Sequence, residues 1–404
     1  MTGDRNRVLV VSQQFLPEMG GNANRVGDTA RYLHDAGWEV TVLAPPRTYP
    51  FGAHERSWER HVHEGYAGVD VHRLWTWQPT RPDPGFLSRL AYYLVFAVHA
   101  TLWVALRRSA FDVVLCATPP PFTAVPGLVA DRLGEAAFVV DVGDLWVDAA
   151  ASLGLVSEGS PLTRATRAFE GLVFSRAAQI LTTTGEMNRQ VTATHGDDVA
   201  AKLVTVPNAV DTGRFTPAEG DGRTVVYAGN FGHAQDLENC VRAMQHVESD
   251  ARLLLVGDGD RRPQIARLVD ELDLGDRVEV RDPVDRAEIP GLLADAAVGL
   301  ATLRRTPGLR YAVPSKTYEY MAAGLPVIGT DIGALAEFLS ESGGGVAVDE
   351  DPRAIAAAID RLVTDDDYRA RLGRQGRAHV EAHYDRTQVG QHLSETLAEL
   401  HTHD

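Results

Sequence analysis

The residues best suited to chemistry lie in the stretch YAVPSKTYEYMAAGLPVIGT, residues 311–330. Pro314 and Ser315 fit a helix start, where the missing N–H of proline is not needed and a serine hydroxyl accepts from free backbone donors. Lys316 and Glu319 are three residues apart, so they occupy neighbouring positions on the first turn. The N-terminus of a helix carries partial positive charge and unpaired N–H groups. We expect it to hold a diphosphate, with Lys316 adding a full charge and Glu319 accepting hydrogen bonds from the two hydroxyls of a ribose.

An ion pair on the surface of an ordinary helix is the alternative explanation of these two residues. The composition argues against it for the lysine, because only Lys202 and Lys316 among 39 basic residues are lysines and all others are arginines. A compact ammonium group, kept where guanidinium is the rule, suggests a confined site.

The elements that must position this site alternate between strands and helices. RVLVVSQ (Arg7–Gln13) is an apolar run predicted as a strand buried on both faces, and a helix over about 26–36 and a strand over Glu39–Ala44 follow. The same order restarts with TVVYAGN (Thr224–Asn230). Strand, helix, strand units of this kind predict doubly wound parallel sheets, in an α/β chain long enough for two domains.

Glycines follow several of the predicted strands. Gly20 and Gly21 precede the first helix, Gly229 and Asn230 end the strand that starts the second half, and Gly257 and Gly259 belong to a Gly-Asp-Gly loop. Bare backbone at these points lets a phosphate, sugar or base approach. Plain turns explain the same glycines equally well. The absence of a GxGxxG motif disfavours nicotinamide dinucleotide binding.

A carboxylate follows another predicted strand, Ala137–Val142. Ligands of open α/β sheets bind outside the carboxyl ends of strands, so the position of Asp144 directs it toward a ligand. The alternative role is a helix N-cap, and both roles can hold together.

Three segments, PSKTYEYMAAGLPVI, DVGDLWVDAA followed by LGLV, and VPNAVDTGRF, resemble glycosyltransferase family 4, and the likeness extends over nearly the whole chain. The subgroup with Pro-Ser-Lys before the helix mostly assembles lipid-linked or cell-surface glycans. The resemblance implies the GT-B fold, two Rossmann-like doubly wound domains facing across a cleft. They would be an acceptor-side domain over residues 1–206, to which 381–404 cross back, and a nucleotide-sugar-binding domain over 207–380.

The resemblance also implies the reaction. A sugar would pass, with retention and without a metal or other cofactor, from a nucleotide-diphosphate sugar to a hydroxyl of a glycan or polyprenyl-linked glycan. Family habit favours UDP. Lys316 would stabilise the leaving diphosphate, Glu319 would hold the ribose and Asp144 would orient the transferred sugar. The family pattern further implies that Gly20 and Gly21 border the diphosphate with Arg25 nearby, and that Arg281 lines the base pocket.

The chain departs from the family pattern in two places. The first glutamate of the usual Glu, seven residues, Glu motif falls at Tyr311, and Glu319 matches the second. Relatives commonly carry an arginine and a lysine after the strand at Thr224, where this chain has no certain cation. A diphosphate bound without a metal needs amides and at least one cation. Lys316, Arg310 and Arg25 are the candidates for that charge.

Charge and cysteine content narrow the class of protein and its location. The net charge of −16 disfavours nucleic acid as a partner, because phosphate backbones require a basic surface. The cysteines, Cys116 and Cys240, form no CxxC motif and are predicted to be buried free thiols. We therefore expect a reducing, cytoplasmic location, and the start of the sequence has no apolar segment of signal-peptide length.

Residues 86–106 form the most apolar stretch of the chain. Because a predicted strand follows at once, we favour a helix packed on the sheet. The alternative is peripheral contact of residues 86–108 with the inner face of the cell membrane, with Arg89, Arg107 and Arg108 near lipid phosphates.

Three other interpretations stay open at this stage. The run Asp365–Asp367 could be taken for a metal motif, but a solvated helix cap is favoured. A sugar-nucleotide epimerase and a non-catalytic nucleotide-sugar-binding protein are alternatives to the transferase.

Overall fold

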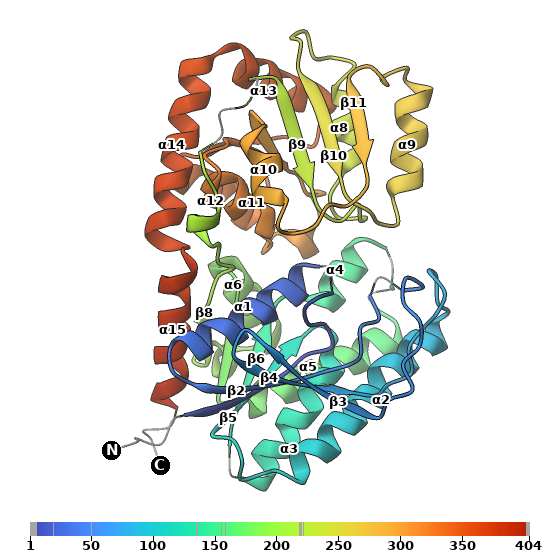
Figure 1. The fold of residues 1–404 in the computed structure, drawn as a ribbon, viewed down its shortest axis with the longest axis vertical. Helices are drawn as coiled ribbons and strands as arrows, with labels where there is room; N and C mark the ends of the chain where they lie inside the picture. Colours follow the sequence, from blue (N-terminus) through green and yellow to red (C-terminus); the bar gives the residue numbers. More distant parts are fainter. Residues whose placement is uncertain are drawn as a thin grey trace. The chain divides into compact units, whose positions relative to one another are not determined.

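The computed structural model describes residues 6–18, 20–49, 51–134, 136–154, 156–157, 159–217, 220 and 222–400. The chain forms two compact units (Figure 1). The first comprises Met1–Ala151, Val156–Pro207 and Thr387–Asp404. The second comprises Ser152–Leu155 and Asn208–Arg386.

An eight-stranded sheet forms the middle of the first unit, in the order β3-β4-β2-β1-β5-β6-β7-β8. All neighbouring strands are parallel except the edge pair β3 and β4. The strands are β1 (Arg7–Val11), β2 (Glu39–Ala44), β3 (His61–Tyr66), β4 (Val69–Leu74), β5 (Val113–Thr118), β6 (Ala137–Val142), β7 (Gln179–Thr182) and β8 (Leu203–Thr205). The order reverses between β1 and β5, which is the point where doubly wound sheets bind ligands.

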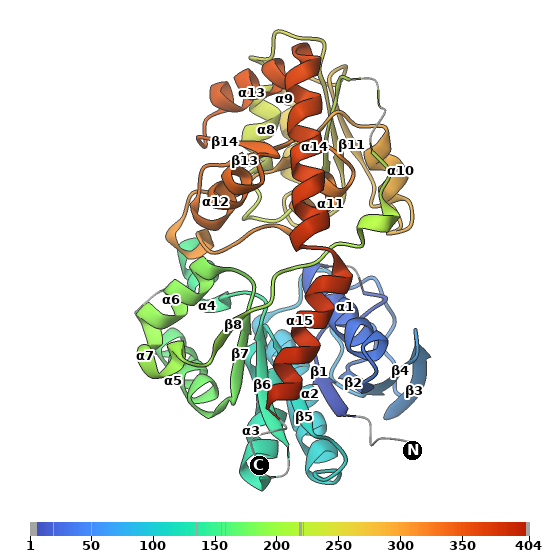
Figure 2. The same ribbon diagram turned by 90° about the vertical axis from the view of Figure 1, so that its left-hand side faces the viewer.

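Helices cover both faces of this sheet (Figures 1 and 2). They are α1 (Gly21–Asp35), α2 (Phe86–Ala105), η1 (Pro121–Ala124), α3 (Val125–Leu133), α4 (Trp146–Ser152), α5 (Pro161–Arg176), α6 (Gly185–His195), α7 (Asp197–Ala200) and α15 (Arg386–Glu399). The last helix packs beside α1, where Trp38 Nε1 donates to Ser394 Oγ at 2.9 Å. Gly390 lies against the Tyr32 side chain, so any larger residue there would clash.

A six-stranded, wholly parallel sheet forms the second unit, in the order β11-β10-β9-β12-β13-β14. The strands are β9 (Thr224–Ala228), β10 (Arg252–Val256), β11 (Val278–Arg281), β12 (Val298–Ala301), β13 (Val327–Thr330) and β14 (Gly345–Val348). The helices are η2 (Thr212–Arg214), α8 (Leu237–Ala243), α9 (Arg262–Glu271), α10 (Ile289–Ala294), η3 (Pro307–Leu309), α11 (Ser315–Ala322), α12 (Gly333–Ser342), α13 (Pro352–Thr364) and α14 (Asp366–His383). Here the order reverses between β9 and β12, so the expected doubly wound class is confirmed for both units.

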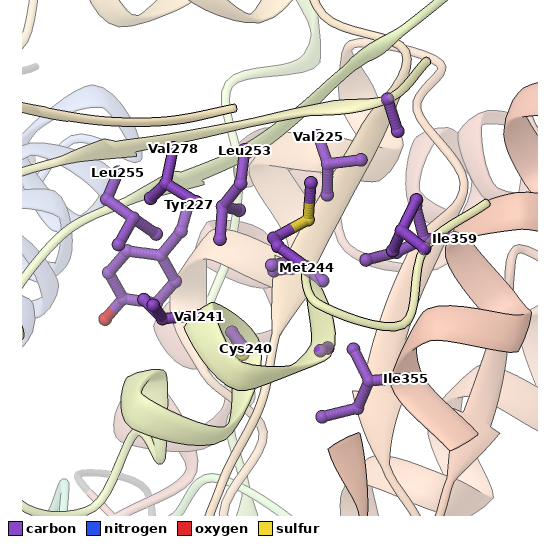
Figure 3. Packing of buried hydrophobic residues seen from close by; sticks show 14 of the residues in the cluster. Val225, Tyr227, Cys240, Val241, Met244, Leu253, Leu255, Val278, Ile355 and Ile359 are labelled. Atoms are coloured by element: carbon purple, nitrogen blue, oxygen red, sulfur yellow. The ribbon is translucent and has the colours of Figure 1, made fainter. Parts of the chain in front are cut away.

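The core of the second unit lies between its sheet and the helices α8 and α13. Val225 and Leu253 point from the strands toward Met244, directly after α8, and Tyr227 points toward Val241 of α8 (Figure 3). Ile359 of α13 belongs to the same cluster. These side chains are 5% exposed or less, and their burial removes a large apolar area from water. Continuous apolar strands such as RLLLV are what a sheet covered on both faces requires.

Local sequence signals set most helix boundaries. The Asp365 carboxylate accepts from the Tyr368 backbone N–H at 2.9 Å, so it caps α14, with Asp366 and Asp367 in the first turn. The favoured cap interpretation of this acidic run is confirmed. Helix α1 begins at Gly21, five residues before the expected start. The sequence did not predict this start, because glycine and asparagine have low helix propensity.

A buried ion pair ties α1 to the sheet of the first unit. Arg25 Nη2 lies 2.7 Å from Asp141 Oδ1, and the same nitrogen donates to the Val206 carbonyl at 3.0 Å. The two side chains are only 8% and 2% exposed. Removing one partner of such a pair leaves a buried, unpaired charge, which costs about 3–5 kcal/mol.

Candidate active site

The N-terminus of α11 holds the lysine singled out by the sequence. Pro314 is the N-cap residue and Ser315 the first helical residue, so Lys316 lies in the first turn. The Lys316 ammonium lies 3.7 Å from the centre of the Tyr227 ring, at the end of β9. A cation over an aromatic face is attracted by the negative face of the ring. This contact fixes the lysine beside the point where the order of the second sheet reverses.

Gly229 keeps space open for the ammonium. A Cβ atom at this position would lie 3.0 Å from Lys316 Nζ, and the backbone φ of +147° also favours glycine. Two tyrosine hydroxyls fix the neighbouring backbone. Tyr320 Oη accepts from the Ala228 N–H at 2.8 Å, and Tyr227 Oη donates to the Asn230 carbonyl at 2.6 Å. Lys316, Gly229 and the end of β9 are therefore held together by direct contacts.

Burial changes the acidity of this lysine. Desolvation lowers the pKa of Lys316 from 10.5 to about 7, and the nearby Glu319 charge acts in the opposite direction. Glu319 itself is partly buried, one turn into the same helix. A lysine with this pKa is half protonated near neutral pH, so an anion that binds beside it would draw a proton onto it.

The other glycine loop of the second unit has a packing reason of its own. A Cβ at Gly257 would lie 1.9 Å from the Gly229 carbonyl oxygen, and one at Gly259 would lie 2.6 Å from Asn230 Oδ1. The Gly229 N–H donates to the Val256 carbonyl at 2.9 Å. The glycines thus let the ends of β9 and β10 approach each other, which brings Gly229, Asn230, Gly257 and Gly259 together.

Three further sequence-selected residues lie in the second unit. Arg281 is at the end of β11, where Glu279 binds its guanidinium at 2.6 and 2.9 Å. Arg310 is exposed, and its carbonyl accepts from the Ala334 N–H at 2.7 Å. Tyr311, at the position of the family's first glutamate, is 2% exposed. A buried phenol there cannot take the place of a carboxylate in solvent.

In the first unit, the start of α1 lies beside the ends of β5 and β6. Gly20, with φ of +149°, is the N-cap residue and Gly21 begins the helix. Asn22 Nδ2 donates to the Pro119 carbonyl at 3.4 Å. Nothing lies within 4 Å of a Cβ placed on Gly20 or Gly21, so both glycines face open space. The charge of Arg25, one turn further along the helix, is matched by Asp141.

Asp144 lies in a small pocket of the first unit, at the end of β6. The other residues of its wall are mostly apolar: Thr118, Pro119, Pro121, Ala124, Val140, Trp146, Glu170, Val173 and Phe174. Burial raises the pKa of Asp144 from 3.8 to about 6, and a hydrogen bond with the Leu145 backbone acts in the opposite direction. Glu170 lies 3.6 Å from His195 Nε2. The pocket therefore offers one carboxylate that ionises close to neutral pH.

The sequence-selected residues fall into two groups. Gly20, Gly21, Arg25 and Asp144 belong to the first unit, and the other sequence-selected residues belong to the second. Sequence reasoning missed Tyr227 and Tyr320, which hold Lys316 and the β9 end in place. Their only signal was an aromatic residue near the end of an apolar strand and another on the inner face of the helix. Among the residues that the structure describes, no group of three or more His, Cys, Asp or Glu side chains is arranged to hold a metal ion.

Comparison with known proteins places the chain in a family. Residues 20–209 match the family model for a glycosyl transferase 4-like domain, and residues 222–365 match that for glycosyl transferases group 1. The putative colanic acid biosynthesis glycosyl transferase WcaI of Escherichia coli is 26% identical, over 87% of this chain and 90% of that protein. A GDP-mannose-dependent alpha-mannosyltransferase of Mycolicibacterium smegmatis is 27% identical, over 93% of each chain.

Solved structures share the fold. A sucrose-phosphate synthase from Thermosynechococcus elongatus has a TM-score of 0.80 at 19% identity, over 98% of this chain and 99% of that one. HepE from Anabaena, solved with UDP-glucose, has a TM-score of 0.74 at 17% identity, over 97% and 99% of the two chains. Together with the two doubly wound units, these likenesses define the GT-B fold.

The chain belongs to glycosyltransferase family 4. It is therefore an enzyme, which transfers a sugar from a nucleotide-sugar donor. The expected family, fold class and enzyme class are confirmed, and the transferase is selected over the epimerase and the non-catalytic binding protein.

Replacing Lys316 separates its role in the reaction from its role in folding. We expect Lys316→Met to lower turnover by about 10²-fold or more, the usual cost of losing one preorganised charge at a developing anion. The melting temperature should change by only a few degrees, because methionine is of similar length and replaces an ammonium group whose desolvation is unfavourable. Steady-state rates and thermal unfolding of both proteins check this. Lys202→Met is the matched control, since the other lysine donates to the Ser175 carbonyl in the first unit. Equal losses of rate and stability would contradict the assignment.

The pH dependence of activity should report the ionisation of the Asp144 carboxyl group. Its pKa of about 6 predicts that kcat/KM falls as the pH drops below 6, because the carboxylate is then protonated. In Asp144→Asn we expect a rate about tenfold lower and the loss of this acid limb, because a neutral amide gives a weaker hydrogen bond than a carboxylate. Asp131→Asn, a change on α3, should leave the profile intact. An unchanged acid limb in Asp144→Asn would assign it to another group.

Proposed function

We propose that this enzyme is a retaining, metal-independent glycosyltransferase that uses a UDP-sugar and transfers the sugar to a hydroxyl of a glycan or lipid-linked glycan. The observation that carries the proposal is the Lys316 ammonium at the N-terminus of α11, beside Gly229 and over Tyr227. A diphosphate is the dianion that fits a helix start with one added cation. Glu319, one turn further along the same helix, would accept hydrogen bonds from the ribose.

The reaction would proceed on one face of the sugar. The bond from the anomeric carbon to the diphosphate oxygen breaks, and the bond to the acceptor oxygen forms on the same face. The acceptor proton passes to the leaving diphosphate, so no separate base is needed. Lys316 and the backbone amides of α11 stabilise the charge that develops on the diphosphate. Asp144 orients the sugar or the incoming hydroxyl.

Support for the donor base comes from related proteins. HepE was solved with UDP-glucose, and the staphylococcal protein TarM with UDP. Other relatives are named GDP-mannose-dependent mannosyltransferases, so GDP is the competing base. For the acceptor, WcaI is named for biosynthesis of colanic acid, and WaaG, which shares the fold with a TM-score of 0.68, for lipopolysaccharide biosynthesis.

A thermal-shift panel of UDP, GDP and ADP, each alone and as its glucose or mannose conjugate, tests the donor. We expect UDP compounds to raise the melting temperature most, and the shift to be smaller in Lys316→Met but unchanged in Lys202→Met. Binding that saturates the folded state at 100 times its Kd stabilises it by about 2.7 kcal/mol, which gives a clear signal. A larger shift with GDP compounds would replace UDP in the proposal.

The stereochemistry and the role of metal need a second measurement with the preferred donor. Proton NMR of the product should show the anomeric configuration of the donor, and EDTA should leave the rate unchanged. Donor incubated alone should yield no isomerised sugar. An inverted product or a rate lost to EDTA and restored by Mg²⁺ would overturn the mechanism.

A further inference from the structure

Helix α2 leaves a long apolar stripe uncovered in the first unit. Leu87, Leu94, Val98, Leu102 and Leu106 recur at spacings of seven and four residues, so they share one side of the helix. Their exposed fractions run from 40% to 81%. At 1.5 Å per residue the stripe is about 30 Å long. Soluble monomers rarely expose a contiguous apolar patch of this extent without a binding partner.

The opposite side of the same helix is part of the protein core. Tyr92, Phe96 and Ala100 are 2% exposed or less, and α2 packs against α3 (Figure 1). Tyr92 also donates to the Gln13 carbonyl at 3.2 Å. The helix is long and apolar enough to cross a membrane by length and composition. Crossing would remove its packed side from the unit, so only the uncovered stripe is free to meet another surface.

Charge around the stripe identifies what that surface is. The chain carries 55 acidic residues, yet residues 84–111 contain none. The same segment contains Arg89, Arg107 and Arg108, one near the start of the helix and two just after its end. The Arg107 guanidinium lies 4.2 Å from the centre of the Trp103 ring, and Arg107 is exposed, so its charge stays at the surface beside the helix. Arg89 also binds Asp83 at 3.1 Å, so the end of the helix with Arg107 and Arg108 carries most of the positive charge. An apolar stripe with cations at that end matches a lipid leaflet with anionic phosphates.

Aromatic side chains extend the surface at the first turn of α2. Trp77 Nε1 donates to Ser88 Oγ at 3.0 Å, and the Arg56 guanidinium lies 3.9 Å from the Trp77 ring. Trp58 is 70% exposed, and Phe86 is 62% exposed. Tryptophan and arginine are the side chains that settle at the boundary between lipid tails and headgroups. A second copy of this chain fits less well, because the helix carries no acidic residue to pair with Arg107 or Arg108 of another copy, and the neighbouring Asp83 already binds Arg89.

We propose that the α2 stripe, defined as Leu87, Leu94, Val98, Leu102 and Leu106 with the flanking arginines, docks the enzyme on the surface of an anionic membrane. The helix lies in the plane of the interface with its inner side still packed on α3. This surface is separate from the residues assigned to the donor, and the proposal does not depend on which donor is used.

Vesicle sedimentation of the full chain tests the docking surface, without nucleotide. We expect binding to vesicles of phosphatidylglycerol and phosphatidylethanolamine, and at least tenfold weaker binding to phosphatidylcholine vesicles. The double variant Val98→Glu/Leu102→Glu should lower the partition coefficient on anionic vesicles at least tenfold. Its matched control is Leu162→Glu/Leu172→Glu, which makes the same change at residues 54% and 47% exposed on α5.

A separate variant tests the contribution of the arginines. Arg107 and Arg108 are exposed, so replacing them should not affect folding. Arg107→Gln/Arg108→Gln should weaken binding to anionic vesicles severalfold and leave binding to neutral vesicles unchanged, and added salt should have the same effect. A wild-type chain that stays in the supernatant, or an α5 control that loses binding as much as the α2 variant, would overturn the proposal.

Two other occupants of the stripe give distinct outcomes. A dimer in light scattering that becomes a monomer in Val98→Glu/Leu102→Glu would make the stripe an interface between copies of this chain, and would overturn the membrane assignment. Resistance of the native membrane fraction to alkaline carbonate extraction would indicate a spanning helix, and would also overturn it. Failure of vesicle binding leaves the Lys316 experiments unaffected, so the two proposals fail independently.

Discussion

The account depends on one desolvated ammonium group. Lys316 is held between the ring of Tyr227 and the backbone of Gly229, at the start of α11. In water its pKa would be near 10.5, and burial in the protein lowers it to about 7. The folded protein therefore bears the cost of a cation that is only partly solvated. A dianion bound at the start of the helix would offset that cost by its attraction to the ammonium group.

The surrounding structure serves to hold this arrangement. Gly257 allows β10 to approach the Gly229 carbonyl, and the Tyr320 hydroxyl fixes the backbone at Ala228. In the first unit the buried Arg25–Asp141 pair fixes α1 against β6. Gly20 and Gly21 at the start of α1 and the pocket around Asp144 therefore both lie at the carboxyl ends of the strands. Both sheets thus present rigid strand ends, each at the point where the strand order reverses.

Local patterns predicted much of this structure. The strands Glu39–Ala44 and Ala137–Val142 have the expected bounds, because runs of apolar residues determine them. The buried free thiols and the α14 cap were predicted for the same reason. The edge strand β3 was not, since HVHEGY is exposed and has no apolar alternation. Its pairing with β4 comes from backbone hydrogen bonds and from contacts across the pair, such as Arg73 with Glu64 at 2.7 Å, which no local pattern reveals.

Contacts between distant residues could not be predicted from the sequence. Lys316 was identified by its rarity and position, but its ring contact with Tyr227 needs the packing of α11 against β9. Arg25 was a candidate for the diphosphate, and only the fold places Asp141, 116 residues away, against its guanidinium. The close contact between Gly257 and the Gly229 carbonyl likewise depends on how two strands pack. From the sequence alone, these glycines could equally have formed a plain turn or a ligand-binding loop.

Proton uptake on nucleotide binding tests the central claim most directly. Titration calorimetry of UDP at pH 8, in buffers of different ionisation enthalpy, gives the number of protons taken up by the complex. A lysine with a pKa of about 7 is mostly neutral at this pH, and a bound diphosphate should recharge it. The account predicts uptake approaching one proton in the wild-type enzyme and close to none in Lys316→Met. Equal uptake by the two proteins, or none by the wild type, would contradict it.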